Sequence, residues 1–67
     1  MEYYINVAEP FECLGEIRYK FLMRINVNYG NVKRIYHKTI NDYPDCKVTV
    51  YRKEEISKEL DMNKCNY

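Results

Sequence analysis

Apolar and polar side chains alternate along residues 17–29 with a period of two. All seven odd positions are apolar or aromatic: Ile17, Tyr19, Phe21, Met23, Ile25, Val27 and Tyr29. Five of the six even positions are polar or charged, and Leu22 is the exception. This period predicts a half-buried β-strand and does not fit the three- and four-residue steps of a helix. The strand is long for a small domain, so we expect it to bend or to extend past the core.

Two shorter segments, residues 3–7 and 47–53, also alternate and are predicted to be strands. We expect the first strand to end at Pro10, because proline cannot donate a hydrogen bond to a neighbouring strand. Residues 9–16 are then expected to form a wide loop in which Gly15 supplies a positive φ angle.

Residues 32–42 allow two interpretations, and turn signals flank them at residues 28–31 and 41–45. A helix would begin after Asn31 as its N-cap. Its apolar face would consist of Val32, Ile35, Tyr36, Thr39 and Ile40. A strand would pair with the long strand through a tight turn, and several of these residues have good strand propensity. We favour the strand, because the long strand needs a partner.

Residues 54–62 are predicted to form a short helix. Ile56 and Leu60 lie four residues apart, and Glu54 and Lys58 can form an ion pair in the favourable order. A helix this short and weakly apolar must pack on the sheet to be stable.

These elements predict an α+β fold: a small antiparallel sheet of about four strands with one short C-terminal helix. We expect residues 1–67 to form a single domain, with residues 63–67 frayed. A chain of 67 residues buries only about 60% of the surface of its unfolded form, so its stability is marginal without help. Self-association supplies such help, and we expect a homodimer.

The formal net charge of +1 conceals an uneven distribution. Residues 17–52 contain eight Lys or Arg and two Asp, a balance of +6. The rest of the chain contains three Lys and eight acidic residues, a balance of −5. A basic centre with acidic ends can steer a charged partner, or let two copies dock head to tail.

The three cysteines have long, irregular spacings that do not suggest a disulfide framework. The sequence has neither a secretory signal pattern nor an apolar run near the roughly 18 residues of a membrane span. We therefore expect a cytoplasmic protein with free thiols that does not associate with membranes.

Side chains able to carry out catalysis or bind a metal are few and scattered. The one histidine, His37, and the one serine, Ser57, do not occur in a motif typical of nucleophilic catalysis. Cys13, His37, Cys46 and Cys65 include ligand types that zinc accepts, but they lack the close pairs of structural zinc sites. We predict that the protein is not an enzyme and uses no metal or other cofactor.

Binding a protein is the function that the sequence favours. Eight tyrosines exceed what one small core can bury, and tyrosine and arginine are the residue types that anchor interfaces. The residues expected to bind the partner are Arg18, Lys20, Arg24, Lys33, Arg34, Tyr4, Tyr36 and Tyr51. As the alternative, the same basic, tyrosine-rich sheet face binds nucleic acid by pairing with phosphates and stacking on bases.

Asn, Lys, Ile, Tyr, Met and Phe supply 33 of the 67 residues. The codons for these residues are rich in A and T, and a short reading frame of this kind is typical of a bacteriophage or another mobile element. The resulting hypothesis is an accessory protein that inhibits or modulates a host or defence protein in the host cytoplasm.

Overall fold

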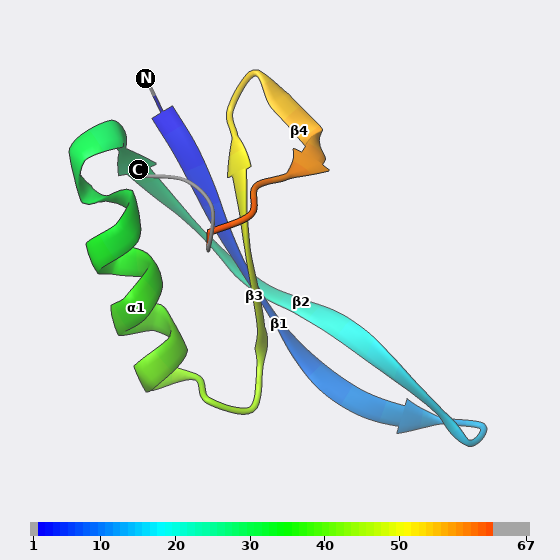
Figure 1. Ribbon diagram of the computed structural model, residues 1–67. Helices are drawn as coiled ribbons and strands as arrows, with labels where there is room; N and C mark the ends of the chain where they lie inside the picture. The colour runs from blue at the N-terminus through cyan, green and yellow to red at the C-terminus, as the bar shows by residue number, and fades with distance from the viewer. Residues whose placement is uncertain (1, 63–67) are drawn as a thin grey trace.

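The computed structural model describes residues 2–62, which form one four-stranded antiparallel sheet and one α-helix. The elements in chain order are β1 (Glu2–Cys13), β2 (Glu16–Asn28), a 3₁₀ turn (Tyr29–Asn31), α1 (Val32–Asp42), β3 (Lys47–Arg52) and β4 (Glu55–Glu59). The strand order is β2-β1-β3-β4, so β2 and β4 are the two edges (Figure 1). The predicted α+β class and the sheet of four strands are confirmed. No helix among the described residues is long and apolar enough to cross a membrane.

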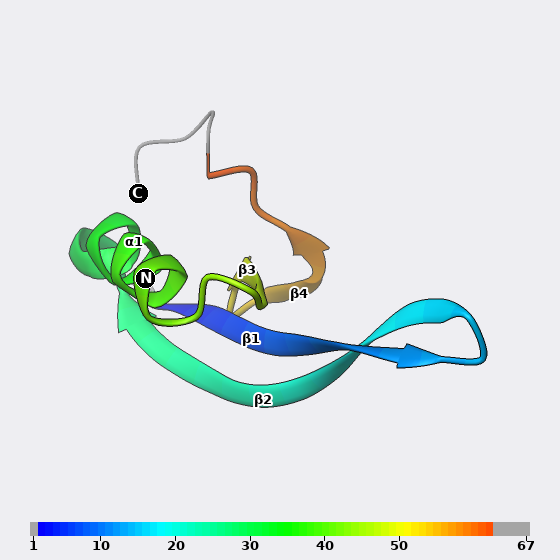
Figure 2. The same cartoon turned by 90° about the horizontal axis from the view of Figure 1, so that it is seen from below.

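The core lies between α1 and one face of the sheet. Its buried members are Tyr3, Ile5, Val27, Val32 and Val50. Alternate side chains of a strand point to opposite faces, so the odd residues of β1 and the facing residues of β2 and β3 meet the helix. We call the other face of the sheet the outer face; among residues 2–62, no element packs over it (Figure 2).

The helix is α1, so the preferred strand interpretation of residues 32–42 was wrong. Val32 and Thr39 are buried on the face of α1 that meets the sheet, and Ile35 and Tyr36 pack beside them. The spacing of these four residues fits a helical stripe. The long strand also needs no partner from this segment, because it pairs with β1 along its whole length. Covering the apolar face of the sheet therefore outweighs strand propensity.

The C-terminal position predicted for the helix was also wrong, because Glu55–Glu59 is strand β4. Ile56 is 58% exposed, so this segment does not bury the apolar stripe that a short helix would need. It pairs instead with the open edge of β3, and the Leu60 amide donates to the Val50 carbonyl at 2.8 Å. The predicted fraying of residues 63–67 lies outside the described residues.

The wide loop predicted for residues 9–16 is a tight hairpin turn. Leu14 and Gly15 both have positive φ, 53° and 79°, as a type I′ turn requires. The positive φ expected at Gly15 is thus confirmed. β1 continues through Pro10 because its pairing with β3 ends at Ala8, so that from there onward β1 has a hydrogen-bonding neighbour on one side only.

β1 and β2 therefore continue beyond the rest of the sheet as a two-stranded ribbon, which we call the arm and define as residues 9–22. It projects from the body as the blue and cyan hairpin of Figure 1. The molecule is accordingly elongated, with principal extents of 40 × 25 × 21 Å. The prediction that the long strand extends past the core is confirmed.

Candidate functional site

The pairing of β1 with β2 changes register at the root of the arm. Val7 pairs with Met23, but Ala8, the next residue, pairs with Phe21. Leu22 is left without a Cα partner, which is the signature of a β-bulge. A shift of one residue moves every later side chain of a strand to the other face of the sheet.

The bulge divides the apolar stripe of β2 between the two faces of the sheet. Before the bulge, Val27 pairs with buried Tyr3 and Met23 with buried Val7, on the face that meets α1. Beyond it, Phe21 pairs with Ala8, whose side chain alternates with that of Val7 and so points to the outer face. Tyr19 and Ile17 follow at steps of two on the same face. We call Ile17, Tyr19 and Phe21 the arm stripe.

A contact from β3 agrees with this assignment. Lys47 also pairs with Ala8, which puts its side chain on the outer face. Its ammonium nitrogen lies 5.2 Å from the centroid of the Tyr19 ring, within the range of a cation–π interaction. Tyr19 therefore lies on the outer face.

The arm stripe is exposed to solvent. Ile17, Tyr19 and Phe21 are 64%, 51% and 57% exposed, whereas Ile5 and Val7 on the other face of the same ribbon are fully buried. Of the eight large hydrophobic residues exposed among residues 2–62, six belong to the arm. At roughly 200 Å² for each side chain, the three stripe residues expose about 350 Å² on one face, within the ~300–600 Å² of the largest apolar patch on a typical monomer. The outer face of the arm therefore presents an apolar patch of the size that is often functional.

Three of the predicted partner-binding residues lie together on the outer face. Arg24 Nε donates to Asn6 Oδ1 at 3.0 Å, and its guanidinium lies 4.6 Å from the centroid of the Tyr4 ring. Tyr51 pairs with Tyr4 in register. Arg24 and Lys47 thus each occupy one face of a tyrosine ring, that of Tyr4 and that of Tyr19.

The other five predicted residues lie elsewhere. Arg18 and Lys20 pair with Phe11 and Glu9, on the face of the ribbon opposite to Arg24. The prediction that Arg18, Lys20 and Arg24 share one strand face was therefore wrong, and the bulge is the reason. Whether any of these residues binds a partner stays a prediction.

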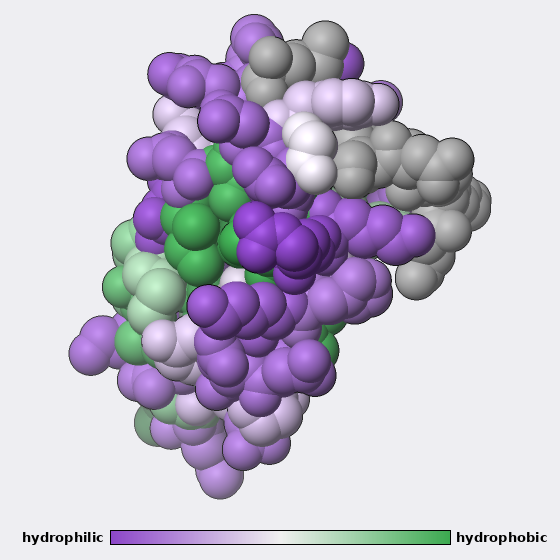
Figure 3. Space-filling view, turned by 90° about the vertical axis from the view of Figure 1, so that its left-hand side faces the viewer, coloured by the Kyte–Doolittle hydropathy of each residue, from purple (hydrophilic) through white to green (hydrophobic). Residues whose placement is uncertain are grey.

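Helix α1 supplies Lys33, Arg34 and Tyr36. Lys33 and Arg34 are exposed, and Arg34 donates to the side chain of Asn31 at 3.3 Å. Tyr36 is half-buried and packs against the core. The side of the molecule on which α1 lies is mostly hydrophilic, with apolar areas between the hydrophilic side chains (Figure 3).

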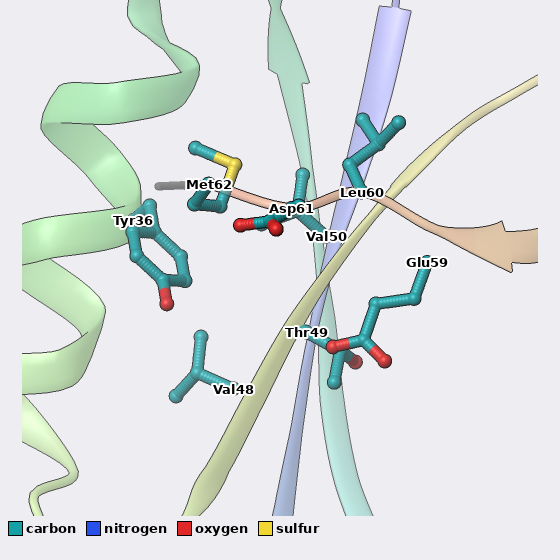
Figure 4. A pocket seen from close by; sticks show the side chains of 8 residues that line it. All are labelled: Tyr36, Val48, Thr49, Val50, Glu59, Leu60, Asp61 and Met62. Atoms are coloured by element: carbon teal, nitrogen blue, oxygen red, sulfur yellow. The ribbon is translucent and has the colours of Figure 1, made fainter. Parts of the chain in front are cut away.

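A pocket of about 360 Å³ opens between α1 and the segment that follows β4 (Figure 4). Its lining residues are Tyr36, Val48, Thr49, Val50, Glu59, Leu60, Asp61 and Met62. The carboxylates of Glu59 and Asp61 and the hydroxyls of Tyr36 and Thr49 thus lie among the apolar side chains of the lining. His37 and Ser57, which were considered for catalysis, do not line this pocket: the His37 ring contacts the Tyr36 ring from the exposed side of α1, and Ser57 is exposed on β4.

The thiols of Cys13 and Cys46 are free and half-buried, and Cys65 lies outside the described residues. Within residues 2–62, no group of three or more His, Cys, Asp or Glu side chains could hold a metal ion.

One ion pair connects β1 with the end of β3. Lys53 Nζ donates to Glu2 Oε2 at 2.8 Å, and both side chains are about half exposed. The hydrogen bond and charge of Lys53 lower the pKa of Glu2, and the same partner raises the pKa of Lys53.

Sequence reasoning did not identify the arm stripe as a candidate site, because Ile17, Tyr19 and Phe21 continue the period of the core residues of β2. The available signal was Leu22, the one apolar residue at an even position of the strand. A single break in an otherwise strict alternation is where an extra, unpaired residue can be accommodated. Comparison of the chain with protein-family models, curated proteins and solved structures found no match.

Proposed function

We propose that this chain is a small, non-catalytic protein-binding protein that contacts its partner through the arm. The observation that carries the proposal is the arm stripe, which the bulge directs away from α1. Side chains of this size and exposure, gathered on a projecting element, are typical of interaction sites. The related hypothesis, that the partner is a host or defence protein modulated by a phage-encoded chain, rests on composition alone.

The energetics indicate what such a partner must provide. The three stripe residues expose roughly 350 Å², at ~200 Å² for each side chain. Covering them would contribute about 9 kcal/mol at ~25 cal/mol per Å², before the ~4–15 kcal/mol cost of association is subtracted. The stripe is therefore an anchor rather than a whole interface. The partner must also contact Leu14 at the tip of the arm, which is 95% exposed.

Two features favour a protein partner over a nucleic acid. Ile17, Leu14 and Leu22 are aliphatic, so they offer neither hydrogen bonds nor aromatic faces to bases, and Arg24 and Lys47 cover the rings of Tyr4 and Tyr19. A net charge of +1 also provides little general attraction for phosphates.

Site-specific photo-crosslinking tests the proposal. A benzophenone amino acid is placed at Tyr19 or, as a matched control, at Tyr29, an aromatic residue of similar exposure (53%) outside the arm. In the protein's own cells, we expect a crosslinked protein from position 19 that disappears when Ile17→Ser is added. Equal crosslinking from both positions, or none from position 19, would contradict the proposal.

A titration of labelled oligonucleotides, at about 50 and 200 mM salt, tests the nucleic-acid alternative. Micromolar binding that collapses at the higher salt would replace the protein partner with a nucleic acid. Absence of binding at the lower salt would remove that alternative.

A further inference from the structure

The two edges of the sheet carry opposite charge. β2 is an edge strand of 13 residues and contains Arg18, Lys20 and Arg24 against a single acid, Glu16. β4 is the opposite edge, and all five of its residues are exposed. Residues 54–61, which include β4, contain four acids and one lysine. An open edge offers backbone N–H and C=O groups to any strand that can approach it.

We propose that the open edge of β2 pairs with β4 of a second copy of this chain. The contact is made by strand edges and is independent of the partner proposed for the outer face of the arm. It is head to tail, because the two surfaces differ, and contacts of this type form chains or rings rather than simple two-fold dimers. It is a specific form of the head-to-tail docking that the basic centre and acidic ends of the sequence allow.

Charge determines which edges can pair. Two copies of β2 side by side would bring the basic side chains of the same strand together, and like charges on paired strands are destabilising. β2 beside β4 places Arg18 and Lys20 near Glu55 and Glu59 instead. Within the chain, Arg18 pairs with Glu16 at 3.5 Å, and Glu9 lies opposite Lys20 in the register of β1 and β2; these acids are exposed, so their interactions contribute little that would oppose the edge contact.

Charged and apolar side chains alternate along both strands of the proposed pair. Along the arm, Arg18 and Lys20 lie on one face of β2 and the arm stripe on the other. In residues 55–61 the acidic side chains occupy odd positions, while Ile56 and Leu60 occupy even positions. When a strand is added to an open edge, reversing its direction also turns it over, so parallel and antiparallel addition place a given side chain on opposite faces of the sheet. One of the two therefore brings the acids beside Arg18 and Lys20, and exposed Ile56 beside the arm stripe.

A charge-swap experiment on the purified protein tests this pairing. In variant A, Arg18→Glu and Lys20→Glu make both edges acidic; in variant B, Glu55→Lys and Glu59→Lys make both edges basic. Sedimentation velocity should show that wild type assembles with rising concentration, and that each variant alone assembles about tenfold or more weakly. An equimolar mixture of A and B should assemble, because each basic edge again meets an acidic one.

A third variant, Lys33→Glu with Arg34→Glu, changes the net charge as much as variant A but on the exposed side of α1, and it should assemble like wild type. Circular dichroism checks that all variants are folded. The assembly of wild type should also weaken steeply as the salt concentration rises from about 50 to 500 mM. The edge pairing would be overturned by any of three results: wild type is monomeric, variant A or B alone assembles as strongly as wild type, or the mixture of A and B is monomeric. Crosslinking from Tyr19 to a second copy of this chain would report the edge pairing, whereas crosslinking to a different protein would report the proposed function, so the two proposals can fail separately.

Discussion

Two identical substitutions on the two sides of the bulge test the division of the β2 stripe. Ile5→Val and Ile17→Val each remove one methylene from an isoleucine, the first in the part of β1 that pairs with both β2 and β3 and the second in the arm. Ile5 is fully buried and pairs with Ile25, whereas Ile17 is 64% exposed and pairs with Glu12. The chemical change is the same, so any difference in the effect reports the environment.

The expected magnitudes follow from burial. A fully buried methylene contributes about 0.8 kcal/mol, and Ile→Val in a core costs roughly 0.5–1.5 kcal/mol once imperfect repacking is included. Ile17 keeps only about a third of its surface from water, so its methylene contributes about 0.3 kcal/mol. A chain of this length is expected to have a total stability of roughly 3–10 kcal/mol, so both variants should fold.

Urea denaturation followed by circular dichroism measures both free energies of unfolding. We expect Ile5→Val to be about 1 kcal/mol less stable than wild type, and Ile17→Val to be within about 0.3 kcal/mol of it. If Ile17→Val were as destabilising as Ile5→Val, Ile17 would be packed in the core, and the outward direction of the arm stripe would be refuted.

Two further predictions concern the turn and the ion pair. Gly15→Ala should reduce the amide-exchange protection of the arm by about 1 kcal/mol, because Gly15 has φ +79°. The control Gly30→Ala should not reduce this protection, because Gly30 has no positive φ and has open space around it. Equal effects of the two substitutions would contradict the turn geometry. Glu2→Gln should be less stable than wild type near neutral pH. The lowered pKa of Glu2 stabilises the fold at pH values above 4.5, the ordinary pKa of this carboxyl group, and the raised pKa of Lys53 stabilises it at pH values below 10.5, the ordinary pKa of that amine. The difference should vanish as the pH falls through the lowered pKa of Glu2, and a difference that persists in acid would exclude the ion pair as its cause.

The strands could be predicted from the sequence because alternation is a strong signal over many residues. β2 spans Glu16–Asn28 where residues 17–29 were predicted, and β3 spans Lys47–Arg52 where residues 47–53 were predicted. The short segments 32–42 and 54–62 were assigned incorrectly, since their patterns fit a helix and a strand almost equally. The choice depends on which segment covers the sheet, which is a property of the whole fold.

The candidate site was less predictable than the fold. Composition drew attention to tyrosine and arginine, but it could not place them on a face of the sheet, because one unpaired residue at Leu22 reverses the faces of every residue of β2 on the arm side of it. Arg24 consequently lies with Tyr4, while Arg18 and Lys20 lie on the opposite face. The alternation of the sequence predicts the strands, and only the register shows which side chains share a face of the sheet.

The central claim is that the bulge at Leu22 directs the arm stripe to the outer face, and interstrand nuclear Overhauser effects test it most directly. In isotope-labelled protein, the account predicts contacts of Val7 with Met23, of Ala8 with Phe21, and of the Tyr19 ring with the methylenes of Lys47. An unbroken register would instead pair Ala8 with Leu22. That result would place the stripe on the same face as α1 and contradict the proposed binding surface.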